Sequence, residues 1–337
     1  MRGTRRIHPL ALMAVAPVLI AVTLAVSILY GAKNIDASTI VEAVFHFDPS
    51  DIDHQIVTQS RMPRAVGALL IGAFLAVSGA IMQGMTRNYL ASPSIMGVSD
   101  GSVVAVTLCL ILLPATSKLG LILCSLAGSA LGALLVFGLA WLLPNGTSPV
   151  RMAILGTIVG TFLGGAAEAA AMYFQVSQSV SFWYNARLNQ MDPALIKLVI
   201  PFAAAGLILA LGLSKSITLL SMGDEIAAGL GQRTMLVKGL SMLCVVILTG
   251  VSVALAGKIA FVGLLVPHIV RFLVGVDYRF VIPCSALLGG LFLAWCDIGS
   301  RFVNAPFETP IGVVTSMIGV PFFLYLIKRK GGRTHAV

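Results

Sequence analysis

The fold is decided by residues 60–88, SRMPRAVGALLIGAFLAVSGAIMQGMTRN. Arg61 and Arg64 stand at the front, residues 65–86 carry no charge, and Arg87 closes the stretch. A helix needs about 20 apolar residues to cross the hydrocarbon core of a membrane. The stretch therefore predicts a membrane-spanning helix with two cations at its mouth.

The composition extends this prediction to the whole chain. Of its 337 residues, 58% are hydrophobic and only 10% are charged, whereas soluble domains carry about 25% charged residues. The net charge of +9 fits the Lys and Arg excess of cytoplasmic loops. The sequence lacks a basic run interleaved with aromatic residues, which is the pattern that would predict nucleic-acid binding. We therefore expect a multi-pass protein of the cell (cytoplasmic or inner) membrane.

Ten apolar segments predict an all-α polytopic membrane fold, with about ten transmembrane helices in one domain, residues 1–337. Helices satisfy their own backbone hydrogen bonds in lipid. The first segment is longer than the apolar part of a signal peptide, so we expect it to be retained. The segments are 10–30, 65–86, 94–113, 119–143, 152–174, 194–213, 236–256, 259–276, 280–297 and 309–327.

The distribution of Lys and Arg predicts the orientation. With the N-terminus inside, most of these residues fall at cytoplasmic ends and loops, as the positive-inside rule requires. Both termini are then cytoplasmic, and segments two to five start on the opposite side from segments seven to ten. This layout is typical of an inverted repeat, which many transporters use.

Small residues and cysteines are expected to pack the helices. Glycine or alanine recurs every fourth residue at 72/76, 128/132 and 156/160/164, a spacing that lets helix backbones approach closely in lipid. The five cysteines lie in apolar runs without a C-x-x-C pair. This predicts buried thiols rather than a metal site.

Three cations, Arg61, Arg64 and Arg301, are expected on the outer rim. A single surface ion pair contributes only about 0–1 kcal/mol, but several fixed cations form a complementary field for an acidic protein. Binding of lipid phosphates is the alternative.

The segment 219–235 is the longest polar stretch expected on the cytoplasmic side. Asp224 and Glu225 suit the first turn of a short helix, where the helix dipole favours acids. Ile226 and Leu230 then share one face, and Gly231 suits the end of the helix. The pattern predicts either a plug for a cytoplasmic partner or an ordinary interfacial loop.

Two acids, Asp100 and Glu168, lie within apolar segments. Intramembrane acids usually face a cavity or a partner, so each is a candidate for lining a path, with a structural hydrogen bond as the alternative. Gly97 and Gly101 suggest that Asp100 lies near an unwound helix end. His268 is expected to be a packing residue at a kink.

No enzyme motif is present: H-E-x-x-H, G-x-S-x-G and Walker A are all missing. We therefore expect no enzyme, and any ATP would be hydrolysed by another subunit. A proton-coupled transporter using Glu168 or Asp100 is the alternative from another class. A polytopic membrane enzyme would need a catalytic pair at one depth, and the sequence offers none.

Seven motifs follow one another along the chain: R-M-P-R (61–64), G-A-F-L-A-V-S-G-A-I-M-Q (72–83), R-N-Y-L-A-S-P (87–93), G-V-S-D-G (97–101), G-D-E-I-A-A-G-L-G (223–231), F-V-G-L-L-V-P-H-I-V-R (261–271) and E-T-P-I-G-V-V-T-S-M-I-G-V-P-F-F (308–323). Together they resemble the FecCD-type permeases, the membrane subunits of ABC importers for iron-siderophores, haem and cobalamin. The resemblance covers residues 55–328.

The resemblance implies the partners. A second permease subunit, identical or a paralogue, would pair with this chain, together with two cytoplasmic ATPase subunits and an extracytoplasmic binding protein. Arg61, Arg64 and Arg301 would receive acidic residues of the binding protein. ATP would be used by the ATPase, and no cofactor or metal would be bound by this chain. A coupling helix in the ATPase cleft would be formed by Gly223, Asp224, Glu225, Ile226, Leu230 and Gly231.

Two features refine the resemblance. Tyr89 stands where the family usually has proline, which would alter the turn between the second and third segments. F-W-Y-N-A-R-L at 182–188 resembles the hydroxamate-siderophore branch. Haem or cobalamin is the alternative cargo.

Overall fold

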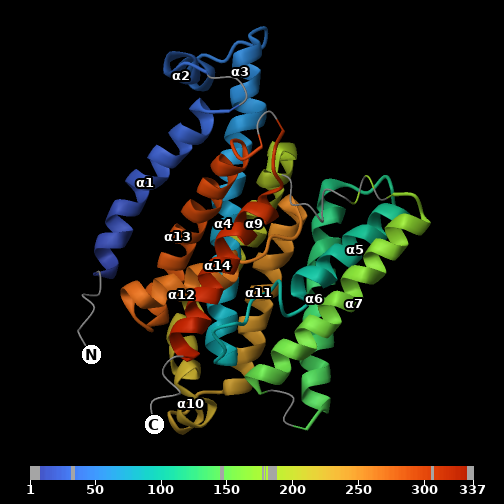
Figure 1. Ribbon diagram of the computed structural model, residues 1–337, viewed down its shortest axis with the longest axis vertical. Coiled ribbons are helices and arrows are strands. Elements are labelled where there is room, and N and C mark those ends of the chain that lie inside the picture. The colour runs from blue at the N-terminus through green and yellow to red at the C-terminus, as the bar shows by residue number, and fades with distance from the viewer. Residues whose placement is uncertain are drawn as a thin grey trace.

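The described part of the chain is a bundle of helices that run mostly along one long axis (Figure 1). The computed structural model describes residues 8–31, 35–144, 148–176, 178, 180, 188–304 and 307–331. Seven helices in this part are long and apolar enough to cross a membrane, and three shorter apolar helices accompany them. Each of the ten predicted segments therefore contains a helix.

The long elements fall into two series. The first is α1 (Pro9–Leu29), α4 (Met62–Thr86), α5 (Val98–Leu112), α6 (Lys118–Leu142) and α7 (Pro149–Tyr173). The second is α9 (Pro193–Met222), α11 (Thr234–Ala256), α12 (Val262–Val274), α13 (Tyr278–Ser300) and α14 (Ile311–Gly331). The short elements are α2 (Ala37–Phe45), α3 (Ile52–Ile56), a π-helical turn (Val57–Arg61), a 3-10 turn (Leu188–Gln190) and α10 (Asp224–Gly229).

The two ends of the bundle differ. Helices α2 and α3 project at one end, and α10 lies at the other (Figure 1); we call these the α2 end and the α10 end. Helix α1 starts and α14 finishes toward the α10 end (Figure 1), so the described parts nearest the two termini share a side. That this side is cytoplasmic stays a prediction.

The order of the helices fits the expected inverted repeat. Helix α4 runs toward the α10 end and α11 runs away from it (Figure 1). Each is followed by a short apolar helix, α5 or α12, which starts directly after a residue with positive φ: Gly97 at 70° and Phe261 at 68°. The chain thus breaks at corresponding places in its two halves, a feature of transporters built from inverted repeats.

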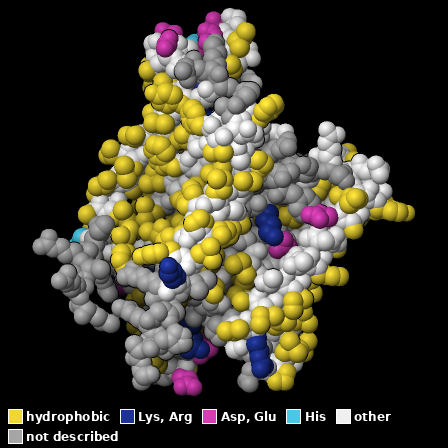
Figure 2. All heavy atoms as spheres, viewed as in Figure 1, with side chains coloured by type: hydrophobic (Ala, Val, Ile, Leu, Met, Phe, Trp, Pro, Cys, Tyr) yellow, Lys and Arg dark blue, Asp and Glu magenta, His cyan; other side chains and the backbone are white. Residues whose placement is uncertain are grey.

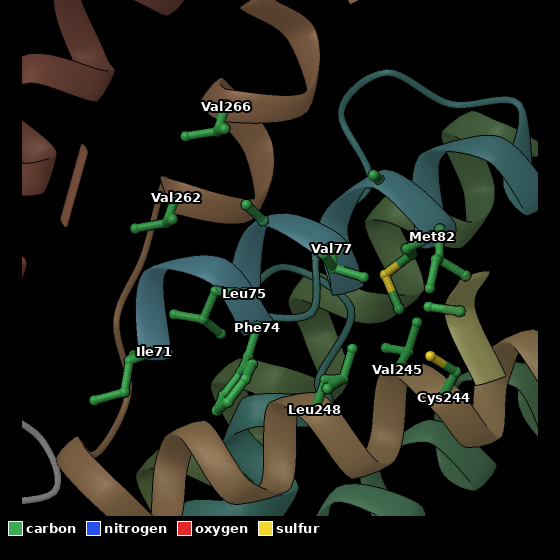
Figure 3. Packing of buried hydrophobic residues seen from close by; sticks show 14 of the residues in the cluster. Ile71, Phe74, Leu75, Val77, Met82, Cys244, Val245, Leu248, Val262 and Val266 are labelled. Atoms are coloured by element: carbon green, nitrogen blue, oxygen red, sulfur yellow. The ribbon is translucent and has the colours of Figure 1, made fainter. Parts of the chain in front are cut away.

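Helix α4 lies at the centre. Figure 3 shows Ile71, Phe74 and Met82 of α4 among side chains of α11 and α12. A Cβ added at Gly72 would overlap the backbone of Gly289 in α13, so the predicted close approach of small residues is confirmed here. Dispersion contacts of this kind hold helices together in lipid, where there is little hydrophobic drive between them.

One helix is longer than the span predicted within it. The predicted span 194–213 belongs to a helix, α9, that continues to Met222. No glycine or proline interrupts it after Gly212, and the hydroxyls of Ser214, Thr218 and Ser221 hydrogen-bond to carbonyls three or four residues earlier, so they continue the helix rather than end it. The segment 219–235 therefore starts inside α9.

Candidate functional site

The predicted coupling segment forms a six-residue helix, α10, between two glycines. Gly223 has φ 139° and Gly231 has φ 81°, conformations that a residue with a Cβ rarely adopts. Asp224 and Glu225 occupy the first turn, as expected. The helix is fixed to its neighbour because Asp224 Oδ2 accepts a hydrogen bond from Lys238 Nζ of α11 at 2.7 Å.

One side of α10 is covered and the other is open. Ala227 is fully buried, whereas Ile226 is 52% exposed and Leu230 65% exposed. Met222 and Met235 beside them are also exposed. We call Met222, Ile226, Leu230 and Met235 the α10 patch. It is an exposed apolar surface on a short helix at one end of the bundle.

The three predicted docking arginines meet at the α2 end, but they are not open to solvent. Arg64 Nε donates to Asp297 Oδ1 at 2.9 Å, and Arg64 Nη1 donates to Glu308 Oε1 at 2.6 Å. Arg301 Nη2 donates to Asp297 Oδ2 at 2.6 Å. The Asp297 side chain is 1% exposed, so one buried carboxylate holds two guanidinium groups.

The other contacts of these arginines hold α1. Arg61 Nη1 donates to the carbonyl oxygens of Ile28 and Leu29 at 2.6 and 3.1 Å. Arg301 Nη1 donates to the carbonyl oxygens of Ser27 and Tyr30. The last carbonyls of a helix lack partners inside the helix and attract cations. The arginines therefore cap α1 and fasten it to the bundle.

The three arginines lie at one end of the bundle with their side chains buried, and their docking role stays a prediction. Arg61 and Arg64 are 7% and 8% exposed, and the Arg301 side chain is 6% exposed. The physical reason is the buried acid Asp297 together with the end of α1, both of which attract the guanidinium groups. A pocket of about 420 Å³ nevertheless opens beside Arg64 and Glu308, and Glu308 is 41% exposed.

The two predicted pathway acids line one cavity. Asp100 lies in the first turn of α5, and its Oδ1 accepts from Lys258 Nζ at 2.5 Å. Glu168 of α7 lines the same cavity, whose volume is about 470 Å³. The structure thus brings together Asp100 and Glu168, which are far apart in sequence, and adds Lys258 from the link between α11 and α12.

His268 packs between aromatic rings, as expected for a residue at a kink. Its ring centroid lies 6.3 Å from that of Tyr89 and 6.1 Å from that of Phe322, edge to face in both cases. Tyr89 also lies under Arg271, whose Cζ is 4.8 Å from the ring centroid. Tyr89 is half exposed and contacts both His268 and Arg271. Of the 182–188 motif, residues 182–187 lie outside the described residues.

Asp297 and Lys258 are the residues that reasoning from the sequence missed. Asp297 precedes Arg301 by four residues, a spacing that places two side chains on one helix face, and this signal was available. Lys258 stands in a short link between two apolar runs, where nothing local indicates its partner. Among the described residues no group of three or more potential metal ligands occurs.

Comparison with known proteins decides the family. The model of the FecCD transport family matches residues 19–329. The chain belongs to the FecCD transport family. As a FecCD protein it is a multi-pass permease of the cell membrane and is not itself an enzyme.

FecCD relatives cover nearly the whole chain. The iron-uptake system permease protein FeuB of Bacillus subtilis (strain 168) is 60% identical, over 95% of this chain and 96% of FeuB. The iron(3+)-hydroxamate import system permease protein FhuB of the same organism is 52% identical, over 90% of this chain and 79% of FhuB. A solved structure of a metal-chelate type ABC transporter, in an inward-facing conformation, superposes with TM-score 0.80 at 26% identity, covering 96% of this chain and 100% of that one.

Proposed function

We propose that this chain is the membrane-spanning permease subunit of an ATP-binding-cassette importer for an iron-siderophore complex. FeuB and FhuB, at 60% and 52% identity, carry iron uptake and iron(3+)-hydroxamate import in their names. A hydroxamate siderophore is the cargo type that we propose within this class. A second permease subunit, identical or a paralogue, completes the path.

The observation that carries the proposal is the α10 patch. An ATP-driven importer without an ATPase motif of its own must receive force from a separate subunit, and this requires a surface outside the bilayer where that subunit can bind. Helix α10 offers exposed Ile226 and Leu230 on a backbone held by two glycines and by the Asp224–Lys238 ion pair. We propose that the patch binds a cleft of a cytoplasmic ATPase subunit, so that closure of the ATPases moves α10.

At the α2 end we propose that an acidic extracytoplasmic binding protein docks by exchanging one of its carboxylates for Glu308 as the partner of Arg64. A partner carboxylate would enter the pocket beside Arg64 and replace Glu308, which is partly exposed and accepts a hydrogen bond from Arg64 Nη1. Arg61 and Arg301 would keep α1 in place meanwhile. Lipid phosphate at the same arginines is the competing interpretation.

Reconstitution tests the proposal. The chain is incorporated into liposomes with its second permease and ATPase subunits, the binding protein is added outside, and uptake of radiolabelled iron as a hydroxamate chelate is followed. We expect uptake that requires both ATP and the binding protein. Uptake driven by a pH gradient without the ATPase would contradict the proposal and favour the proton-coupled alternative. Competition by unlabelled haem or cobalamin shows whether the cargo class is wrong.

A further inference from the structure

The cavity that contains Asp100 lies between α5, α7 and the link before α12. Its wall is made mostly of small residues of α7, together with Ser94 and Ile95, and it carries three charged side chains: Asp100, Glu168 and Lys258. Figure 2 shows basic and acidic side chains together at mid-height over α5 and α7, on a face that is otherwise mostly apolar or uncharged. Charges at this depth are costly in lipid and mark paths for polar solutes.

The ion pair in this cavity joins the two breaks in the fold. Asp100 lies in the first turn of α5, after Gly97, and Lys258 lies in the link that precedes α12. In transporters built from inverted repeats, interrupted helices at corresponding positions surround the substrate site. The Lys258–Asp100 contact therefore lies where this architecture places a solute.

The two side chains of this ion pair differ in solvent exposure. The Asp100 side chain is 6% exposed and the Lys258 side chain is 33% exposed. A Cβ at Gly160 would lie 2.8 Å from Asp100 Oδ2, so glycine leaves the room that this carboxylate occupies. A solute in the cavity would meet the ammonium group first, with Asp100 behind it.

An ammonium group paired with a carboxylate binds an anionic solute weakly enough to release it during transport. The ammonium has three hydrogen-bond donors, of which one is directed to Asp100, and the hydroxyl of Thr161 lines the same cavity. The negative charge of Asp100 weakens the hold of Lys258 on any second anion. Passage requires a site that attracts a solute but also releases it.

We propose that Lys258 contacts the cargo in transit, and that the cargo is a metal chelate whose surface presents carbonyl, carboxylate or phenolate oxygens. Asp100 is a positioning residue that holds the ammonium toward the cavity. This inference rests on the proposed function, because it takes the cargo to be a chelate. It adds a residue that the docking and coupling surfaces do not contain.

Two variants test the proposal in the reconstituted complex. Asp100→Asn/Lys258→Met removes the pair and leaves the net charge of the cavity unchanged, so no buried charge is left unpaired; Glu168 remains in place. Gly165→Leu fills the cavity, and nothing lies within 4 Å of a Cβ at this glycine. Gly138→Leu in α6 is the matched control, because Gly138 also has open space and does not line the cavity.

We expect the double variant to slow ATP-dependent uptake of the iron chelate about tenfold, the effect of one lost charge-assisted hydrogen bond. Gly165→Leu should slow uptake at least as much, and Gly138→Leu should leave it unchanged. Assembly with the ATPase and affinity for the binding protein should stay at wild-type values in all three.

Wild-type uptake by the double variant would overturn the role of Lys258. Equal losses in Gly165→Leu and Gly138→Leu would overturn the role of the cavity. If the wild-type complex itself shows no ATP-dependent uptake, the proposed function fails instead, so the two failures are distinct.

Discussion

The two ends of the bundle treat their charged residues in opposite ways. At the α2 end three arginines are buried against Asp297 and the last carbonyls of α1. At the α10 end one exposed ion pair, Asp224–Lys238, fixes a helix whose apolar side chains are open. Buried cations therefore hold helices together at the α2 end, whereas exposed apolar side chains offer a binding surface at the α10 end.

The largest effect is expected from Asp297→Asn. Removing one partner of a buried ion pair leaves uncompensated charge and costs about 3–5 kcal/mol. We therefore expect a clearly lower midpoint of thermal unfolding for the purified chain in lipid nanodiscs.

Asp277→Asn in the same region of sequence is the matched control. Its partner Arg279 is 56% exposed, so solvent screens the pair and it should contribute little to stability, and asparagine still caps the helix. Equal losses of stability in the two variants would show that burial of Asp297 does not decide its effect.

Leu230→Asp sharpens the comparison at the α10 end. Because Leu230 is 65% exposed, we expect a change of less than about 0.5 kcal/mol in stability. A charge in a binding hot spot should nevertheless lower ATP-dependent uptake about tenfold or more. Glu225→Ala should act in the same direction, and Leu230→Met serves as the conservative control. Normal uptake by Leu230→Asp would remove the coupling role of the patch.

Glu308→Gln tests docking at the α2 end without removing the buried contacts of Asp297. Reversing the charge of all three arginines should weaken capture of the binding protein, but it would also break the network around Asp297. Glu308→Gln instead removes the negative charge that competes for Arg64 Nη1, and we expect affinity for the binding protein to rise about twofold to fivefold in low salt.

Glu42→Gln is the control for this variant, since Glu42 is an exposed acid on α2 at the same end. It removes the same charge without releasing Arg64. If both variants raise the affinity equally, net charge and not exchange at Arg64 explains docking.

The most local effect concerns the glycines of α10. Gly231→Ala forces an alanine to φ 81°, which costs about 1–2 kcal/mol and should speed hydrogen exchange in α10. Gly229→Ala, at a helical position with open space, should slow exchange slightly because alanine favours helix by about 1 kcal/mol. Faster exchange in Gly229→Ala than in Gly231→Ala would contradict the assigned role of Gly231.

Much of this fold could be predicted from the sequence, because uncharged runs long enough to cross a membrane specify helices almost alone. The ends of α10 could also be predicted from residues close in sequence, because two acids start the helix and Gly231 follows its end. The burial of Arg61, Arg64 and Arg301 could not be predicted from residues near them in the sequence. It depends on Asp297, which is 233 residues from Arg64, and on backbone carbonyls of another helix.

The same reason explains what was missed at the cavity. Asp100 and Glu168 are recognisable as acids in apolar runs, but Lys258 is 158 residues from its partner Asp100. Only the folding of the second half onto the first brings the link before α12 to α5. Patterns along the chain predict elements well, whereas pairs between distant elements require the packed structure.

Cysteine cross-linking tests the central claim most directly. The native thiols have no disulfide partners, and only Cys124 among them is partly exposed, so Leu230→Cys would add an accessible thiol to a low background. In membranes that contain the assembled transporter, the account predicts that this cysteine cross-links to the ATPase subunit, with a yield that changes when ATP is added. A cross-link to the binding protein, or none to the ATPase in an active complex, would contradict it.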